Sequence, residues 1–550
     1  MHSTDDVSDC DVVVVGTGAT GGWAAKQLTE GGLQVVILEA GHAFDLEADF
    51  PSSVELAALA SAGTLASRER IDRRFLERQF VQSRRGEYNE TTRRCFVDDV
   101  DNPYTTPDDQ PFDWIRCRTL GGRTLLWGGL MPRWSDYEFK AASRDGIGTD
   151  WPIGHDTLAP SYEVVERFLG VRGEPEHLPH LPDGIFASRF ALTEGEQELK
   201  TRVEARWPDR RVTSVRGVAA GPTEWLPYLY EHPRRWPTFT SVGSTLAAAA
   251  ATGRLVVRSG AIVSRVVIDE RNPDHARGVS YVDHRTGCEH MVRADAVVLC
   301  ASTIESTRIL LHSASPVHPR GVGNSSGVLG RYLMDHPALV VAGAAPSASA
   351  PVEGVHGILI PKFRNLEQRE SNFVRGYGVF GSVGRAGPMA LLCAMCEMLP
   401  RVDNHVELDR LTRDAWGIPS VRICCSYSDN ERRMLEDARQ ELLAIAATCG
   451  WTVEASVPTR PGWFVHDVGT ARMGCTPSDS VLNEWCQCWD VPNIYVTDGA
   501  CFVSSGWQNP TLTMMALTVR ACEHLLAALQ PRRHEPTAHG AVGRSSAAAP

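Results

Sequence analysis

The sequence lacks the features of a membrane or exported protein. Its 550 residues contain no uninterrupted apolar run of the roughly 18 to 20 residues that a membrane-spanning helix needs. The first ten residues, MHSTDDVSDC, have neither the basic nor the apolar region of a secretory signal. We therefore expect a chain with no membrane span and a cytoplasmic location.

Clustered basic charge is also missing. The net charge is −12 and the pI is about 5.9, and no run of basic residues interrupts this acidic balance. We expect no nucleic acid as a partner, because binding to a phosphate backbone depends on gathered lysine and arginine. Lysine is rare, so nearly all positive charge is arginine, and we draw no function from this bias.

Cysteines with the spacing of a metal site are missing as well. The 15 cysteines are scattered, and an odd number in a chain without a signal indicates free thiols in a reducing compartment. Cys393 and Cys396 form a CxxC pair and Cys486 and Cys488 form a CxC pair. A structural zinc site needs four ligands, and LLCAMCEML has the pattern of an apolar strand, so we expect no metal.

The sequence does contain a glycine-rich turn after a buried strand. Residues 11–22 read DVVVVGTGATGG, where four valines lead into Gly16, Gly18 and Gly21. A β-branched run this short predicts a strand covered on both faces, and residues 23–29 predict the helix that follows. The three glycines suit a tight turn, the close approach of a pyrophosphate and close helix–strand packing. They predict a dinucleotide site, against the alternative of a purely structural turn.

An acidic residue ends the next predicted strand. Residues 34–38, QVVIL, predict this strand, and Glu39 follows it directly. A carboxylate about 20 residues after the glycine turn accepts hydrogen bonds from a ribose diol and repels a 2'-phosphate. This βαβ unit by itself fits FAD and NAD equally.

A second glycine-rich segment surrounds one tryptophan. Residues 118–133 read RTLGGRTLLWGGLMPR, with a glycine pair on either side of Trp127. Glycine pairs remove side chains where a planar ring can lie against the backbone, and Trp127 would support that ring. The alternative is a plain turn, and these residues leave both open.

The pattern of strand, turn and helix returns far along the chain. Residues 295–302, DAVVLCAS, predict another buried strand, and residues 304–313 predict a helix. The sheet begun at Val12 is therefore completed late in the sequence, and the nucleotide-binding domain is discontinuous. Residues 430–449 predict a long amphipathic helix, whose apolar stripe belongs to a core.

Residues 462–521 carry the densest group of candidate functional side chains. His466 is followed by a predicted strand over residues 494–497, which ends at Asp498, and Asn509 precedes a predicted helix. A strand that ends in Asp-Gly beside a helix N-terminus can hold a ribityl chain and one side of a flavin ring. A lone histidine is usually structural, so the residues by themselves do not make His466 catalytic.

Several stretches in this order resemble one family. They are DVVVVGTGATGGWAAKQLTEGGLQVVILEAG, PFDWIRCRTLGGRTLLWGG, DWPIGHDTLAPSYEVVERFLGVRG, GNSSGVLGRYLMDHP and HDVGTARMGCTPSDSVLN through NPTLTMMALT. The chain resembles the glucose-methanol-choline (GMC) oxidoreductases, FAD enzymes that oxidise alcohols. Within that family it resembles the bacterial sugar dehydrogenases of the glucoside 3-dehydrogenase catalytic-subunit type. The resemblance extends from the start of the chain to Cys522.

The resemblance implies the fold and its division into domains. The expected class is α/β (α+β overall), with a discontinuous Rossmann-type FAD-binding domain and a substrate domain that has a mixed or antiparallel sheet, as in p-hydroxybenzoate hydroxylase-like architectures. The first domain is assigned to residues 8–48, 112–150, 250–342 and 458–530. The substrate-binding domain and its excursions are assigned to residues 49–111, 151–249 and 343–457, and a disordered tail to residues 531–550.

The resemblance also implies the site residues. His466 matches the histidine that takes the alcohol proton while hydride leaves for flavin N5, and Asn509 matches the residue that orients the same hydroxyl. A neutral imidazole with a pKa near the working pH suits this step. His336 also matches the family, and we interpret it as structural. The residues expected to contact FAD are Gly16, Thr17, Gly18, Ala19, Thr20, Gly21, Glu39, Gly122, Thr124, Trp127, Gly128, Ile262, Val263, Asp498, Gly499, Asn509 and Thr511.

Two departures from the family pattern bear on electron transfer. Relatives with tethered flavin carry a histidine where this chain has Leu126, so FAD is expected to be non-covalent. The closest resembling sugar dehydrogenases carry a cysteine cluster, thought to hold an iron-sulfur centre, in the region that corresponds to residues 225–246. No cysteine occurs between Cys117 and Cys288, and such a cluster needs thiolates, so we expect no iron-sulfur cluster.

The resulting hypothesis is FAD-dependent oxidation of a hydroxyl group on a sugar, glycoside or aminocyclitol. The reduced flavin would then be reoxidised by oxygen or by a diffusible acceptor. The main alternative is a redox-neutral lyase of the hydroxynitrile lyase type, where FAD is structural. A non-catalytic FAD-binding subunit and an NAD-linked dehydrogenase are weaker alternatives. The residues leave open the substrate, the oxidised carbon, the acceptor and the oligomeric state.

Overall fold

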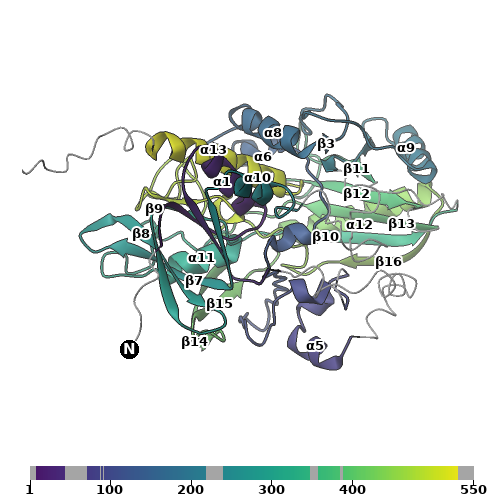
Figure 1. Ribbon diagram of the computed structural model, residues 1–550. Coiled ribbons are helices and arrows are strands. Elements are labelled where there is room, and N and C mark those ends of the chain that lie inside the picture. The colour runs from purple at the N-terminus through teal and green to yellow at the C-terminus, as the bar shows by residue number, and fades with distance from the viewer. Residues whose placement is uncertain are drawn as a thin grey trace, which may run out of the picture.

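Two large β-sheets organise the computed structural model (Figure 1). The structure describes residues 8–43, 71–86, 88–90, 92–218, 240–346, 357–384 and 388–529. One sheet has seven strands and carries the glycine-rich turn, and the other has six. Figure 1 shows the two sheets side by side, the first in its left half and the second in its right half.

The seven-stranded sheet is built around β1, the predicted valine strand. β1 lies between β2 and β9 and is parallel to both, with Val13 opposite Val36 and Val297. The side chains of Val12, Val13 and Val14 are fully buried, as expected for β-branched residues in a strand covered on both faces. The strands are β1 (Ser8–Val15), β2 (Val35–Glu39), β6 (Leu255–Ser259), β7 (Ala261–Asp269), β8 (Asn272–Asp283), β9 (Glu289–Leu299) and β17 (Ile494–Val496), in the order β6-β2-β1-β9-β8-β7 with β17 on β9.

The helices around this sheet come from distant parts of the chain. α1 packs against α10 and α13, α13 packs against α8, and α11 contacts β7. Figure 1 shows α1, α10 and α13 gathered together. The bounds are α1 (Ala19–Glu30), α8 (His155–Leu169), α10 (Thr245–Ala251), α11 (Thr303–His312) and α13 (Thr511–Leu529).

α13 has an unusually apolar sequence. Within the described part of the chain it is the one helix long and apolar enough to cross a membrane. The helix contains Arg520, Glu523 and His524, so it is not an uninterrupted apolar run. Most of the helix is buried against α1 and α8, as expected for a helix in a protein core.

The six-stranded sheet is antiparallel. α12 packs on β10, β13 and β16, and α9 contacts β12. A capping box joins Ser428 to Glu431 at the start of α12, and Met434, Ala438 and Leu442 bury its apolar stripe. The elements are β4 (Thr213–Ser214), β10 (Ala338–Ala344), β11 (Ile358–Ile360), β12 (Tyr377–Val383), β13 (Met389–Cys396), β16 (Thr452–Pro458), α9 (Glu194–Arg206) and α12 (Asp429–Thr448), with strands in the order β16-β10-β13-β12-β11-β4.

Short elements connect these layers. β14 and β15 form one hairpin, and β3 pairs with β5. The bounds are β3 (Val171–Arg172), β5 (Gly217–Val218), β14 (His405–Arg413), β15 (Pro419–Cys424), α5 (Arg73–Arg78), α6 (Asp136–Phe139), α7 (Ala141–Asp145), η1 (Gln82–Arg84), η2 (Thr92–Cys95), η3 (Gly122–Leu125) and η4 (Gly499–Cys501).

The main elements agree with those expected from the sequence. The first βαβ unit, the strand that ends at Leu299 and the helix expected over residues 430–449 are all present. β9 lies beside β1, which confirms that the sheet is completed late in the chain. The domain boundaries stay a prediction. Residues 49–70 of the expected excursion and residues 531–550 of the expected tail lie outside the described residues.

One glycine of the six-stranded sheet should be sensitive to substitution. Gly378 in β12 packs against Trp507, and a Cβ there would lie 2.1 Å from Trp507 Cε3. Because Trp507 is fully buried, we expect Gly378→Ala to lower the free energy of unfolding by about 1 to 3 kcal/mol. Gly86→Ala is the control, since its Cβ would have no atom within 4 Å. Urea unfolding followed by circular dichroism measures both, and equal midpoints would contradict the prediction.

Candidate active site

A cavity of about 480 Å³ lies between the two sheets. Its walls come from the glycine turn, the η3 loop, β7, the loop before α13 and two strands of the six-stranded sheet. Every predicted site residue except Gly21 lines this cavity, so residues separated by almost 500 positions meet at one place.

The three glycines of the first turn have different physical tasks. Gly16 has a φ of +97°, and a Cβ there would lie 2.4 Å from the carbonyl oxygen of Cys300. A Cβ on Gly21 would lie 1.8 Å from the carbonyl oxygen of Gly16, so α1 packs directly on the turn. A Cβ on Gly18 would meet no atom within 4 Å. Packing therefore requires the first and third glycines, and the second leaves space at the N-terminus of α1.

Glu39 is held by the same turn. Its carboxylate accepts hydrogen bonds from the backbone N–H of Thr17 (3.1 Å), the hydroxyl of Thr17 (2.5 Å) and the backbone N–H of Gly41 (2.9 Å). Burial raises the pKa of Glu39 above its ordinary value, although these donors oppose the shift. The hydroxyl of Thr17 also accepts from the backbone N–H of Gly121, which joins the first glycine turn to the second.

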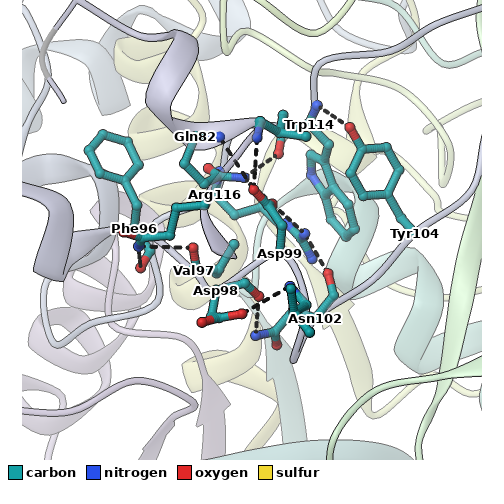
Figure 2. Close-up of polar contacts among 12 residues, drawn as sticks. Gln82, Phe96, Val97, Asp98, Asp99, Asn102, Tyr104, Trp114 and Arg116 are labelled. Carbon is teal, nitrogen blue, oxygen red and sulfur yellow. Dashed lines mark hydrogen bonds and ion pairs between the residues drawn. The ribbon is translucent and has the colours of Figure 1, made fainter. Parts of the chain in front are cut away.

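Arg116 lines the cavity and belongs to a buried polar network (Figure 2). Gln82 bonds to Asp99 Oδ1 (2.7 Å) and to the carbonyl of Trp114 (3.1 Å). Arg116 Nη2 donates to the carbonyl oxygen of Asn102 (2.6 Å) and lies 3.6 Å from Asp99 Oδ1. Its guanidinium also stacks on the Trp114 ring at 4.0 Å. The described residues between 71 and 118 therefore pack around the site, whereas the polar, proline-bearing residues 95–114 predict an excursion over the surface.

A second charged group lines the cavity beside Glu39. Glu305 pairs with Arg308 (2.7 Å) and Arg118 (3.5 Å). Burial favours the neutral acid, but these two arginines prevail and lower the pKa of Glu305 to about 2. Glu305 is therefore ionised at neutral pH.

His466 lines the cavity and contacts a second histidine. The two Nδ1 atoms of His466 and His336 are 2.9 Å apart, and His336 Nε2 is 2.6 Å from the carbonyl oxygen of Gly506. Antiparallel pairing of β10 with β16 brings the two histidines together, because His336 precedes β10 and His466 follows β16. The interpretation of His336 as a purely structural residue therefore overlooked a direct contact with the candidate base.

These contacts decide which nitrogen of His466 carries its proton. A carbonyl oxygen only accepts, so His336 Nε2 carries a proton and donates it to Gly506. Burial lowers the pKa of His336 to about 4, so its Nδ1 is a bare acceptor at neutral pH. His466 must then donate from Nδ1, which leaves its Nε2 bare.

Asn509 completes this arrangement. Its Nδ2 lies 3.4 Å from Nε2 of His466 and can donate to it. Burial lowers the pKa of His466 well below its ordinary value, and His336, Arg123 and Arg85 lower it further. We had expected a pKa near the working pH, and the difference arises because both burial and the neighbouring arginines disfavour the imidazolium. Both effects therefore favour the neutral imidazole of His466.

Asp498 and the start of α13 form the adjacent wall. The carboxylate of Asp498 accepts from the hydroxyl of Ser306 (2.5 Å) and from the backbone N–H of Ala500 (3.0 Å). Burial raises the pKa of Asp498 to about 6. Thr511 is the first residue of α13 and lines the cavity, so the N-terminus of that helix, the positive end of its dipole, lies at the cavity.

Two protein-family models match the chain. Two models, both described as GMC oxidoreductase, match residues 11–338 and 400–518. The chain belongs to the GMC oxidoreductase family. The match confirms the resemblance seen in the sequence, and with it an FAD-dependent oxidoreductase.

Curated relatives align along nearly the whole chain. The protein is 27% identical to 2-methyl-1,2-propanediol dehydrogenase of Mycolicibacterium austroafricanum, over 95% of this chain and 96% of that protein. It is 25% identical to the fructose dehydrogenase large subunit of Gluconobacter japonicus, over 95% and 99%. It is 27% identical to paromamine 6'-oxidase of Streptomyces fradiae, over 97% and 94%.

A solved structure shares the fold. The crystal structure of pyridoxine 4-oxidase from Mesorbium loti matches with a TM-score of 0.61 at 18% identity, covering 96% of this chain and 100% of that chain. This likeness confirms the expected α/β architecture.

The cavity wall fits FAD. Gly18 leaves open space at the N-terminus of α1, where free backbone N–H groups favour a phosphate. Among the described residues, three buried polar atoms on cavity-lining side chains have no partner: Arg116 Nε, Arg308 Nη1 and Asp467 Oδ2. Two guanidinium groups and one carboxylate oxygen suit the phosphates and hydroxyls of a dinucleotide.

Sequence reasoning missed several residues of this wall, namely Arg85, Arg116, Arg123, Phe464 and Asp467. Arg123 lies inside the second glycine segment, and Phe464 and Asp467 flank the candidate base, so position alone could have marked these three. The sequence around Arg85 and Arg116 did not mark them as site residues, because each reaches the cavity only through the tertiary folding of this part of the chain.

Asp335 should make stability depend on pH. It accepts from the backbone N–H groups of His466 (3.0 Å) and Gly462 (2.9 Å), and burial raises its pKa to about 7. The folded state therefore keeps a proton that the unfolded chain loses above about pH 4, so stability falls as pH rises toward 7, by up to about 4 kcal/mol. Asp335→Asn should lack this slope. Urea midpoints from pH 4.5 to 7.5 measure it, and parallel profiles for both proteins would refute this role.

Proposed function

We propose that this protein oxidises a hydroxyl group of a sugar, glycoside or aminocyclitol to a carbonyl group, with His466 as the base. The bound FAD supplies the hydride acceptor at N5. The hydroxyl proton passes to His466 Nε2, while the same carbon loses its hydrogen as hydride. Loss of one proton and one hydride converts C–OH into C=O.

The arrangement of His466, His336 and Asn509 carries this proposal. The two Nδ1 atoms at 2.9 Å and the contact from His336 to Gly506 leave His466 Nε2 bare and directed at Asn509. A lowered pKa keeps the imidazole neutral and able to accept a proton. Asn509 Nδ2 would donate to the hydroxyl oxygen and orient it.

The other site residues support FAD binding in this proposal. The glycine turn with Thr17, Ala19 and Thr20 would hold the pyrophosphate, and Glu39 the ribose. The flavin ring and ribityl chain would lie against the second glycine segment and the start of α13. The remaining proposed contacts are Gly122, Thr124, Trp127, Gly128, Ile262, Val263, Asp498, Gly499 and Thr511.

The substrate class follows from the relatives and from the cavity. The names of the three relatives specify a diol, a sugar and paromamine, so compounds with several hydroxyl groups are the common theme. Phe380, Met395 and Phe464 supply apolar surface near the candidate base, which suits one face of a sugar ring. Relatives include dehydrogenases and an oxidase, so we propose oxygen or a diffusible carrier as acceptor.

A cytoplasmic location is part of the proposal. All 15 cysteines are free thiols, most of them buried, which suits a reducing compartment.

The decisive experiment is anaerobic bleaching of the flavin. Purified protein mixed with glucosides, free sugars and aminoglycosides should lose its visible flavin absorbance with one of these classes, and recolouring in air would identify an oxidase. His466→Ala should keep FAD and lose at least about 100-fold in the rate of flavin reduction. Failure of every hydroxylated compound to bleach bound FAD would favour the redox-neutral lyase. An unchanged rate in His466→Ala would remove His466 from the mechanism.

His336 should act through His466. His336→Ala removes the acceptor for His466 Nδ1–H, so the imidazole can adopt the other tautomer, and we expect flavin reduction to slow by about 10- to 100-fold with FAD retained. His318→Ala is the matched control, because His318 is also buried and contacts a carbonyl oxygen, that of Pro273, away from the cavity. Equal rates in the two variants would assign His336 a structural role alone.

A further inference from the structure

Arg123 contacts the residue on each side of the candidate base, through a backbone carbonyl on one side and a side-chain carboxylate on the other. Its Nη1 donates to the carbonyl oxygen of Val465 (3.0 Å) and lies 3.4 Å from Asp467 Oδ1. These two residues immediately precede and follow His466. Arg123 itself belongs to η3, so a short helix beside the first glycine turn reaches across the cavity wall to the base.

The segment that Arg123 holds is conformationally strained. Val465 has a φ of +65°, in the left-handed region that β-branched residues rarely adopt. Such a conformation persists only when surrounding contacts enforce it. The described contacts that enforce it are Arg123 on the carbonyl of Val465 and the backbone N–H of Val465 on the carbonyl of Gly462 (3.2 Å). Asp335 fixes the next N–H, that of His466.

The charge of Arg123 acts on the same histidine. The groups around His466 are the neutral ring of His336, the carboxylates of Asp335 and Asp467, the amide of Asn509, and two arginines. After burial and His336, the guanidinium of Arg123 lowers the pKa of His466 more than that of Arg85 does. Arg123 is therefore well placed to disfavour the imidazolium.

We propose that Arg123 is the positioning residue of this site: its guanidinium holds the chain on either side of His466 and thereby directs Nε2 at Asn509. The proposal rests on the proposed function, in which His466 is the base. It assigns two separable tasks to one side chain: Nη1 must reach both Val465 and Asp467 to hold the segment, whereas the positive charge alone disfavours the imidazolium.

Two substitutions separate these tasks. Arg123→Met removes both contacts and the charge. Arg123→Lys keeps the charge, but its side chain ends one bond short of the position of Nη1 and so does not reach both acceptors. Flavin reduction by a compound that bleaches the flavin in the experiment above is measured from pH 4 to 9. We expect Arg123→Met to slow reduction about tenfold or more and to move the acid limb of the profile upward by about one pH unit. We expect Arg123→Lys to slow reduction without moving the limb.

Arg85 and Arg265 provide the matched controls. Arg85→Met removes a second charge near His466, one whose Nη1 donates to the carbonyl oxygen of Trp463, so it should move the acid limb in the same direction and by less. Arg265→Met removes an exposed arginine, paired with Glu289, outside the cavity and should change neither rate nor limb. The proposal would be overturned if Arg123→Met had the wild-type rate of flavin reduction at the pH optimum and the wild-type acid limb. It would also be overturned if the acid limb moved equally in Arg123→Lys and Arg123→Met.

A measurement that does not depend on turnover tests the role of Arg123 independently of the proposed function. Diethyl pyrocarbonate modifies neutral imidazole, so peptide mapping of His466 modification in the purified flavoprotein against pH reports its protonation directly. We expect modification of His466 to fall off at a higher pH in Arg123→Met than in wild type as the solution is made more acidic. If no hydroxylated compound bleaches the flavin, the proposed function fails while this profile still tests Arg123. Should Arg123→Met not fold, Arg123→Gln removes the charge but keeps a polar side chain, and an unshifted profile there would also overturn the proposal.

Discussion

The contact between Nδ1 of His466 and Nδ1 of His336 constrains the rest of the site. The two nitrogens are 2.9 Å apart and share one proton. His336 carries its own proton on Nε2 and donates it to the carbonyl oxygen of Gly506, so the shared proton belongs to Nδ1 of His466. His466 consequently presents a bare Nε2 to the cavity. A pair of hydrogen bonds outside the cavity thus decides the chemistry available inside it.

This constraint depends on both sheets. The pairing of β10 with β16 in the six-stranded sheet brings the two histidines together, while Gly506 and Asn509 lie between β17 of the seven-stranded sheet and α13. Trp507, from this same loop, packs on Gly378 of the six-stranded sheet. The base and its partners therefore keep their geometry only while the two sheets stay packed.

Burial sets the electrostatics of the cavity. The pKa of Asp335, Asp498 and Glu39 is raised because desolvation disfavours their carboxylates, and the pKa of His336 and His466 is lowered because it disfavours imidazolium. Glu305 is the exception, since paired arginines keep it ionised. The site thus combines a histidine whose neutral form is favoured with acids whose pKa is raised.

Local sequence was sufficient for the elements whose conformation depends on neighbours in the chain. The valines of β1, the glycine turn, Glu39 and the apolar stripe of α12 follow from short-range periodicity and from the backbone freedom of glycine. The family resemblance added His466 and Asn509. The role of His336, the grip of Arg123 on Val465 and Asp467, and the arrival of Arg116 at the cavity required tertiary structure. These contacts join residues that are 100 to more than 300 positions apart in the sequence. The protonation of a buried side chain depends on its neighbours in space, and a local sequence pattern does not contain that information.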